Sequence, residues 1–398
     1  MKDAPCIRVG MRDADIIGQD NRALQAAVDY VGNLGGGTVL IGPGVYLMED
    51  ALHLCSHVTI RGEGDKSVLR KSPGRMSLLA ADGDYGDDQL TLADPSGFQV
   101  GMGVAVADDH AHGFHVTVAT IVASEGNVFQ INGTFQADYV MSGHAYAANV
   151  FPIVSGRYVE NIRLKNLTIE GNKTENMLLT GCRGAGIYFH RARKVEIIAC
   201  TVRDYNGDGI SFQQSEDVQV VECLCQGNSK LGIHPGSGSQ RPVIGRCRSL
   251  DNGEIGLFFC WRVKHGMALD NELLRNGHAG LSIGHKDTDN LIEGNVISGN
   301  GVVGILFRDE LEPQGAHRNR VLNNTIQDNG NEKEGYGIKI SGETHDLLIR
   351  DNIIGDTRPA REKRQRIGVY VGAKSGNITL EGNRFQGNAV QDVYREAA

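Results

Sequence analysis

The sequence contains little of what anchors a membrane protein or a nucleic-acid-binding protein. Among 398 residues there are one tryptophan and nine prolines, and aromatic residues make up 6%. No apolar stretch has the length that a membrane helix needs. The net charge is −8, so the chain lacks the global positive charge that favours nucleic acid. We therefore expect neither a membrane nor nucleic acid as a partner.

Glycine, by contrast, is abundant: the chain has 53, and eight of them recur at nearly fixed intervals. The first five intervals are 23, 23, 24, 24 and 24 residues, and the series is Gly186, Gly209, Gly232, Gly256, Gly280, Gly304, Gly337 and Gly368. Each except Gly232 opens a short apolar run, such as Gly-Leu-Phe-Phe at Gly256. A fixed period of this length is typical of a solenoid, in which residues one period apart become neighbours in space.

A second recurring position indicates three short strands in each coil. A later apolar run in each period is followed by Cys or Asn, at Cys200, Cys223, Cys247, Asn271, Asn295, Asn324, Asn352 and Asn383. Asparagine tolerates the left-handed backbone of a tight bend, and its amide can bond along a stack. Three strands in about 24 residues predict an all-β parallel β-helix. The three cysteines are expected to stack as reduced thiols, because parallel side chains have poor geometry for a disulfide.

Two segments depart from the repeat. Residues 20–31 have the apolar spacing of an amphipathic helix with Asp20 as its N-cap, and we expect this helix to cap the open end of the solenoid. Residues 82–150 break the period and are predicted to be a β-rich insertion. Regular coils are expected over residues 159–390, and the whole of 1–398 is expected to be one domain.

The chain resembles a known superfamily in two places. The run from Asp20 to Gly64, DNRALQAAVDYVGNLGGGTVLIGPGVYLMEDALHLCSHVTIRGEG, resembles the entry segment of pectate-lyase-like right-handed parallel β-helix proteins, and residues 159–390 resemble their repeats. The resemblance implies a right-handed β-helix. It does not select a reaction, since the superfamily includes polysaccharide lyases, glycoside hydrolases, epimerases and non-catalytic or tailspike members.

Polar residues gather in the turns of the middle coils, between Gly232 and Glu310. Such loops on a rigid scaffold are the usual place for a site. The predicted catalytic residues are His285, Lys286, Asp287, Arg308 and Asp309, and the predicted substrate-binding residues are His234, Trp261, Arg262, Lys264, His265 and Glu310. Trp261, His285 and Asp309 lie 24 residues apart and are expected to form one row. At about 4.8 Å per coil the cluster would span roughly 15 Å, enough for a few sugar rings.

This set of residues suits β-elimination from a uronic acid, or the related epimerisation. That chemistry needs a cation for the sugar carboxylate, for which Arg308, Arg262 and Lys264 are candidates. It also needs a base for the C5 proton, for which His285 or Lys286 would serve if its pKa is lowered. The sequence therefore favours an enzyme that cleaves or modifies an acidic, uronate-containing polysaccharide or oligosaccharide.

Two other functions stay open. Glycoside hydrolysis, or transglycosylation, needs two carboxylates, and Asp287 and Asp309 lie in adjacent coils. A non-catalytic glycan-binding or tailspike-like solenoid would use Trp261 to stack on a sugar ring and the charged residues for selectivity.

No cofactor and no metal site are predicted. The run Asp108-Asp-His-Ala-His-Gly-Phe-His115 holds metal-ligand residue types, but its spacing matches no defined site. The superfamily resemblance leaves a divalent cation such as Ca²⁺ open. A carbohydrate is the expected partner, and a homo-oligomer stays open. The N-terminus lacks the apolar segment of a secretory signal, which favours the cytoplasm over secretion with a trimmed leader.

Overall fold

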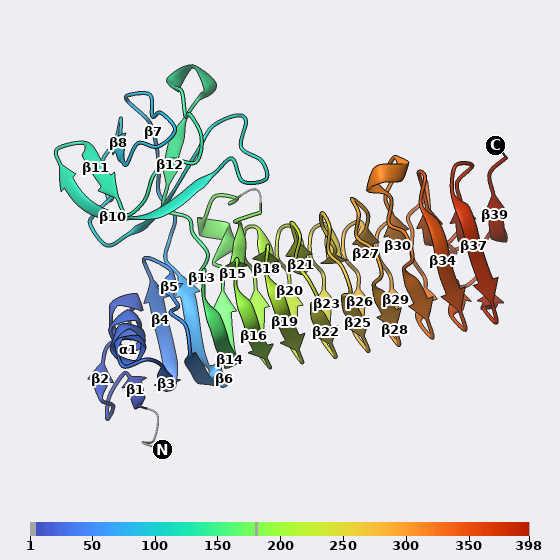
Figure 1. The fold of residues 1–398 in the computed structure, drawn as a ribbon, viewed down its shortest axis with the longest axis horizontal. Coiled ribbons are helices and arrows are strands. Elements are labelled where there is room, and N and C mark those ends of the chain that lie inside the picture. Colours follow the sequence, from blue (N-terminus) through green and yellow to red (C-terminus); the bar gives the residue numbers. More distant parts are fainter. Residues whose placement is uncertain (1–4, 180–181, 398) are drawn as a thin grey trace. The chain divides into compact units, whose positions relative to one another are not determined.

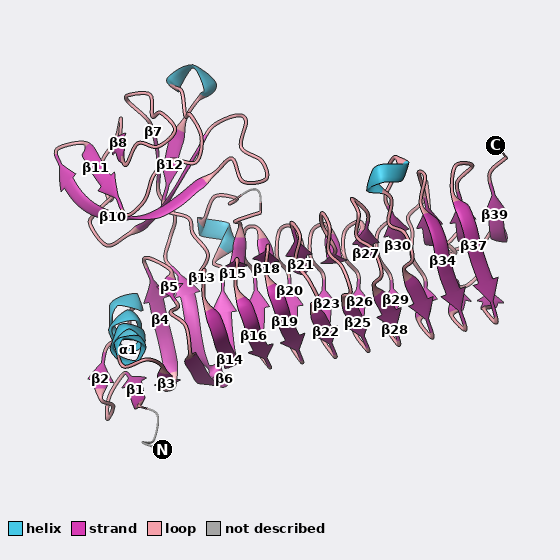
Figure 2. Ribbon diagram, in the orientation of Figure 1, coloured by secondary structure: helices cyan, strands magenta, loops and turns pink. Residues whose placement is uncertain are grey.

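The computed structural model describes residues 5–179 and 182–397 and consists mainly of strands (Figure 2). By its contacts the chain divides into two compact units. The first comprises Met1–Val159, Lys165–Phe189 and Val202–Ser211, and the second comprises Glu160–Leu164, His190–Thr201 and Phe212–Ala398. No helix among the described residues is long and apolar enough to cross a membrane.

The predicted helix is α1 (Asn21–Asn33), which lies in the first unit after two short strands. Asp20 is its N-cap, since the carboxylate accepts hydrogen bonds from the amides of Arg22 and Ala23 at 3.0 and 3.3 Å. The helix packs on β1 and β3 through an apolar stripe that includes Leu24 and Val28. The strands of this segment are β1 (Cys6–Gly10), β2 (Ile16–Ile17), β3 (Gly37–Ile41), β4 (Gly44–Met48), β5 (Leu52–His53) and β6 (Val58–Lys71). Strands β1, β3, β4 and β6 pair in parallel.

The segment predicted as an insertion, residues 82–150, forms a six-stranded antiparallel sheet together with the preceding strand β7, in the order β7-β12-β9-β10-β11-β8. Its strands are β7 (Met76–Leu78), β8 (Gln89–Thr91), β9 (Gly103–Ala107), β10 (Thr117–Glu125), β11 (Val128–Ile131) and β12 (Tyr146–Ala148), with a 3-10 turn η1 (Met141–Gly143). Leu90, Phe129 and Tyr139 lie in its own buried core. Strand β13 (Val154–Arg157) then pairs in parallel with β5, which resumes the coils.

Five further strands and one 3-10 turn precede the regular part of the second unit. They are β14 (Glu160–Glu170), η2 (Lys173–Glu175), β15 (Ala185–His190), β16 (Arg193–Ile198), β17 (Thr201–Arg203) and β18 (Asp208–Gln213).

The second unit consists of coils with three strands each, stacked as three parallel ladders (Figure 1). The first ladder contains β16, β19 (Glu216–Val221), β22 (Val243–Gly245), β25 (Met267–Leu269), β28 (Leu291–Glu293), β31 (Arg320–Leu322), β34 (His345–Arg350) and β37 (Gly376–Glu381). The second contains β20 (Leu224–Gln226), β23 (Arg248–Leu250), β26 (Glu272–Leu274), β29 (Val296–Ser298), β32 (Thr325–Gln327), β35 (Ile353–Gly355) and β38 (Arg384–Gln386). The third contains β21 (Ile233–Gly236), β24 (Ile255–Phe258), β27 (Ala279–Ile283), β30 (Val303–Phe307), β33 (Tyr336–Ile340), β36 (Ile367–Val371) and β39 (Gln391–Arg395). This is the predicted right-handed parallel β-helix.

The glycine period has a steric cause. A Cβ added at Gly256 would lie 2.7 Å from the carbonyl oxygen of Gly280, and one at Gly304 would lie 2.6 Å from that of Gly337. Only glycine allows the backbone of one coil to approach the next so closely. The glycines therefore mark contacts between coils of the third ladder.

The predicted Cys and Asn column is a buried ladder along the second unit. The Cys247 amide donates to Asn271 Oδ1 at 2.9 Å, and the same bond repeats from Asn271 to Asn295 and onward to Asn383. The cysteines of the chain are free thiols, as expected. The expectation of a left-handed backbone at the asparagines is wrong, because the residue before each of them takes it. Asp270 has φ 54° and Asp351 has φ 56°.

Asn295→Ala is expected to lower the free energy of unfolding by about 2–4 kcal/mol, because it leaves several buried polar groups without a hydrogen-bond partner. Asn295 Oδ1 accepts from both the amide and Nδ2 of Asn271, and its Nδ2 donates to the Ala268 carbonyl at 2.9 Å. Urea denaturation would measure the loss. The exposed amide Gln226 serves as the control, and a Gln226→Ala effect as large as that of Asn295→Ala would contradict the prediction.

Candidate functional site

Two neighbouring turns after the third ladder have an unusual backbone. Trp261 and Arg262 follow β24 with φ 59° and 65°, and His285 and Lys286 follow β27 with φ 42° and 64°. Single left-handed residues recur throughout the coils, as at Asp270 and Asp351, so it is the two successive ones that distinguish these turns. The Arg262 amide donates to the His285 carbonyl at 2.8 Å, and the Trp261 and His285 rings stack 4.6 Å apart at 11°. The two turns thus form one stacked surface.

Arg308, directly after β30, connects three coils. Its Nη2 lies 3.1 Å from Asp287 Oδ2, and its Nη1 donates to Ser282 Oγ at 3.0 Å. Its guanidinium carbon lies 4.6 Å from the centroid of the Phe258 ring. Ser282 and Phe258 were not predicted as site residues, although they are register partners in β27 and β24. Comparing the glycine coils position by position would have revealed both.

Asp287 is an anchor for Arg308. The residue is 0% exposed, and its carboxylate also accepts from the amides of Val263 at 2.8 Å and Gly284 at 3.0 Å. Burial raises the pKa of Asp287 to about 7, against the opposing effect of Arg308 and the two amides. Because every contact of this carboxylate is internal, Asp287 is a positioning residue.

Glu310 and His285 form a polar pair beside Arg308. Glu310 Oε1 lies 3.1 Å from His285 Nδ1 and 4.0 Å from Arg308 Nε. Burial raises the pKa of Glu310, while burial and the Arg308 cation lower the pKa of His285. Environments that bring the proton affinities of an acid and a base closer together suit proton transfer near neutral pH.

The predicted row of Trp261, His285 and Asp309 is wrong at its third position. His285 meets Glu310, whereas Asp309 is exposed and lines a groove with Lys339 and Tyr370. The physical reason is the turn backbone, since no residue from Arg308 to Glu310 has the positive φ of the two preceding turns. The coil that starts at Gly304 is also longer, so the 24-residue spacing no longer predicts which side chains meet.

The remaining predicted residues fall into two groups. His234 lies within β21, not in a turn, and is buried with its ring 5.2 Å from that of Phe258. Lys264 lies at a bridge to Gln240 and Thr288, on the approach to β25, and His265 is exposed. Among the described residues, no hydrogen bond, ion pair or ring contact links the side chain of either Lys264 or His265 to the stacked turns.

The coils of the chain match a known protein family. A family model described as "Right handed beta helix region" matches residues 153–261 and 259–395. The chain belongs to this right-handed β-helix family. No curated protein matches the sequence of this β-helix protein.

Several solved structures are similar to the β-helix protein. The A-module of the Azotobacter vinelandii mannuronan C-5 epimerase AlgE4 has 14% identity and a TM-score of 0.61, over 98% of this chain and 100% of that chain. A polygalacturonase from Erwinia carotovora ssp. carotovora has 12% identity and a TM-score of 0.62, over 100% and 98%. The Pseudomonas phage phi297 tailspike gp61 has 13% identity and a TM-score of 0.50, over 91% and 68%. These similarities confirm the predicted superfamily fold.

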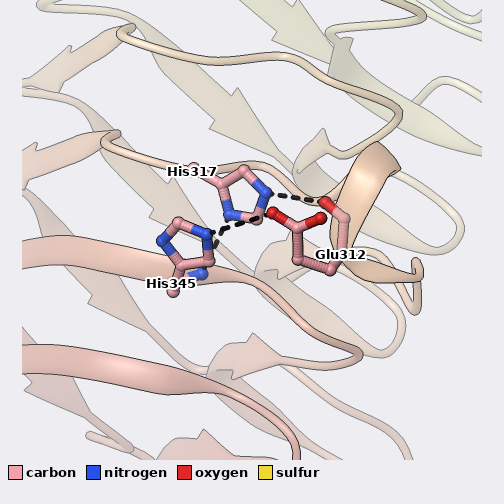
Figure 3. Close-up of side chains that lie close together, drawn as sticks. All are labelled: Glu312, His317 and His345. Atoms are coloured by element: carbon pink, nitrogen blue, oxygen red, sulfur yellow. Dashed lines mark hydrogen bonds and ion pairs between the residues drawn. The ribbon is translucent and has the colours of Figure 1, made fainter.

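A second polar cluster of the β-helix protein involves the 3-10 turn η3 (Glu312–Gln314). The ligand atoms of Glu312, His317 and His345 lie within 4.8 Å of one another (Figure 3). The two imidazole rings stack 3.6 Å apart at 19°, so their in-plane lone pairs run side by side and do not converge on one point. Both nitrogens of His317 already bond to the backbone, Nε2 to the Glu312 carbonyl at 2.9 Å and Nδ1 to the His345 amide at 3.2 Å. The contacts of this cluster therefore fit a structural role, in which they hold the long coil together. Its nitrogen donors do not suit Ca²⁺.

The histidine-rich loop of the insertion forms pairs of its own. His115 Nε2 and His110 Nδ1 lie 3.2 and 3.5 Å from the Asp108 carboxylate, and the His112 ring stacks on that of His115 at 6.1 Å. Within the described ranges, these residues do not form a group of three whose ligand atoms all lie within 4.8 Å of one another, as those of Glu312, His317 and His345 do.

The single tryptophan makes the protonation of His285 measurable. We expect Trp261 fluorescence to fall as His285 becomes charged, since the cationic ring would lie in the stack. Because Arg308 lowers the pKa of His285, Arg308→Gln should move this transition to higher pH. A fluorescence titration from pH 4 to 9 gives the result. His285→Gln should abolish the transition, and an unchanged curve in that variant would refute the assignment.

Proposed function

We propose that this protein modifies an acidic, uronate-containing polysaccharide by removing the C5 proton of a uronate, with β-elimination as the outcome. The observation that carries the proposal is a pair of cations, exposed Arg262 and half-buried Lys286, which directly follow Trp261 and His285 in the two stacked turns. Among the described residues, neither cationic side chain has a hydrogen bond or an ion pair. Several arginines elsewhere on the coils, though not all, pair with an acid one coil away, as Arg275 does with Asp251 at 2.8 Å.

The unpaired cations fit the carboxylate of an anionic sugar. Arg262 offers a planar fork of donors, and its guanidinium carbon lies 5.9 Å from the centroid of the Trp261 ring, which is 44% exposed and available to a sugar face. Neutralising the carboxylate acidifies the C5 proton, because the charge that develops on proton removal is delocalised onto that group. Cation and aromatic ring would together orient one uronate over His285.

The acid and the base of the reaction come from the same cluster. His285, kept neutral by burial and Arg308, takes the C5 proton, and the C–H electron pair forms the C4–C5 double bond. The C4–O4 bond breaks with its electron pair on oxygen, and Glu310, whose pKa burial raises, protonates that oxygen. Return of a proton to the opposite face of C5, without loss of O4, would instead give the epimer.

The geometry argues against a hydrolase that uses Asp287 and Asp309. Asp287 is fully buried and bonded to Arg308 and two amides, so it cannot activate water or attack a sugar. The names of two neighbours, mannuronan C-5 epimerase and polygalacturonase, refer to polymers of uronic acids, which supports the substrate class. A non-catalytic glycan-binding solenoid remains the alternative, because Trp261 and the free cations would bind a glycan without turnover.

A panel of uronate-containing and neutral polysaccharides tests the proposal. β-Elimination gives a product that absorbs in the ultraviolet, hydrolysis gives new reducing ends without it, and epimerisation changes the nuclear magnetic resonance spectrum of the polymer without cleavage. An unsaturated product from an acidic polymer supports the proposal. Turnover of neutral glycans alone, or binding of uronates with no turnover, would overturn it.

A further inference from the structure

The first unit contains a cavity of about 280 Å³ between the insertion strand β10 and the segments around β5 and β13. Its wall is apolar at Val118 and Phe151 and basic at Arg157 and Arg183, with Tyr188 beside them. The volume is just below the roughly 300–1,000 Å³ of pockets that hold drug-sized ligands, which suits one sugar residue. All of these residues belong to the first unit, so the cavity is defined within it.

Arg183 is a buried cation for which the described part of the chain provides no counter-charge. The residue is 5% exposed, its Nε makes no hydrogen bond, and among the described residues its guanidinium takes part in no hydrogen bond or ion pair. Its ring contact is with Phe114, at 5.3 Å from the guanidinium carbon. Proteins bury a charge only when it is paired or bound to a ligand, because desolvation of an unpaired ion is costly. A bound anion would therefore provide the counter-charge that the described residues do not supply to this guanidinium.

The acid among the described residues that line the cavity already has partners of its own. Asp50 lines the cavity, but Asp50 Oδ2 accepts from Thr120 Oγ1 at 2.7 Å and lies 3.1 Å from His53 Nε2, while Oδ1 accepts from the Ala51 amide at 2.7 Å. Arg157, the second cation of the wall, has no ion pair among the described residues and repels Arg183. The cavity thus holds two guanidinium groups and no available carboxylate.

We propose that this cavity is a binding site for one acidic sugar residue, whose carboxylate pairs with Arg183 and Arg157. Arginine matches a carboxylate with two parallel donors, and the low dielectric of a buried pocket strengthens the pair. Tyr188 keeps its proton, since burial raises the pKa of its phenol to about 12, and its hydroxyl is a further polar group of the wall. Phe151 and Val118 provide the apolar surface for the sugar ring. The site is separate from the reaction assigned to Glu310 and does not depend on it.

The test uses the full-length protein, glucuronate as the acidic probe, glucose as its neutral match and inorganic sulfate as a bare anion. Isothermal titration should show glucuronate binding that weakens at least tenfold in Arg183→Met and severalfold in Arg157→Gln. Glucose should not bind. Arg12→Gln, an exposed arginine of the same unit, is the control and should bind glucuronate as the wild type does. Glucuronate binding that depends on Arg262 and not on Arg183 would belong to the site of the proposed reaction and would overturn the assignment to this cavity.

Thermal denaturation without ligand gives a second readout. Removing an uncompensated buried charge should leave the melting temperature of Arg183→Met equal to or above that of the wild type, and glucuronate should raise the melting temperature of the wild type alone. A lower melting temperature in Arg183→Met, with no effect of glucuronate on the wild type, would show that Arg183 is structural and overturn the proposal. Arg183-dependent binding of sulfate without binding of glucuronate would overturn the assignment to an acidic sugar.

Discussion

Arg308→Met should lower the free energy of unfolding by about 3–5 kcal/mol, because it leaves the Asp287 carboxylate buried without its cation. Asp287 is 0% exposed and retains only the amides of Val263 and Gly284 as donors. Urea denaturation followed by the fluorescence of Trp261 measures the change. The double variant Arg308→Met/Asp287→Asn should recover most of the loss, since it removes both charges together.

The same variant has a pH signature. Burial raises the pKa of Asp287 from 3.8 to about 7, so its protonated form stabilises the folded state fully below pH 4 and this contribution is lost as the pH rises through 7. Without Arg308, burial raises the pKa of Asp287 without opposition from that cation, so the carboxyl is protonated more readily. The stability deficit of Arg308→Met should therefore shrink as the pH falls from 8 to 5. The control is Arg275→Met, whose exposed pair with Asp251 should cost at most about 1 kcal/mol. Equal losses in the two variants would contradict the role given to Arg308.

Glu310→Gln should lower kcat on a uronate polymer by about 10²–10⁴-fold, because it removes the acid that protonates the leaving oxygen. The amide is close in size and keeps a polar contact with His285, so the thermal stability should change little. Steady-state assays of the ultraviolet-absorbing product measure the loss. Glu343→Gln, a partly exposed glutamate paired with Lys374, is the matched control and should retain wild-type turnover.

Asp309→Asn separates the two possible assignments in this coil. The 24-residue spacing alone favours Asp309, whereas the distance of 3.1 Å from His285 favours Glu310. We therefore expect Asp309→Asn to change kcat less than about threefold. A loss in Asp309→Asn that equals the loss in Glu310→Gln would contradict the assignment of the catalytic acid to Glu310 alone.

The fold could be predicted because its physical causes repeat in the sequence. The glycines recur where backbones of successive coils come within van der Waals contact, and Asp20 marks the start of α1 by capping two amides. Periodicity also placed Trp261 next to His285 correctly. It failed where a coil departs from the repeat, as at Asp309, and where a strand continues past an expected turn, as at His234.

Other parts of the site have no signal in one sequence. The Asp287 carboxylate accepts from backbone amides of two coils, at Val263 and Gly284, and the pattern of charges does not reveal these contacts. The cavity at Arg183 combines residues from the insertion and from the coils, separated by more than a hundred positions between Asp50 and Arg183. Only the tertiary structure shows that these groups share a space and that a cation in it is unpaired.

The asparagine ladder gives the second unit a direction. Each side-chain oxygen accepts from the preceding coil, as Asn324 Oδ1 does from Asn295, so the amide dipoles point the same way along the column and polarise one another. The ends of the column are therefore unequal. Loss of the last coil would deprive the Asn352 amide and Nδ2 of the oxygen of Asn383, whereas the opposite end begins at a cysteine. Fraying should accordingly spread inward more readily from the carboxyl-terminal coils. A chain shortened there would need a new hydrogen-bond acceptor for the last asparagine of the ladder.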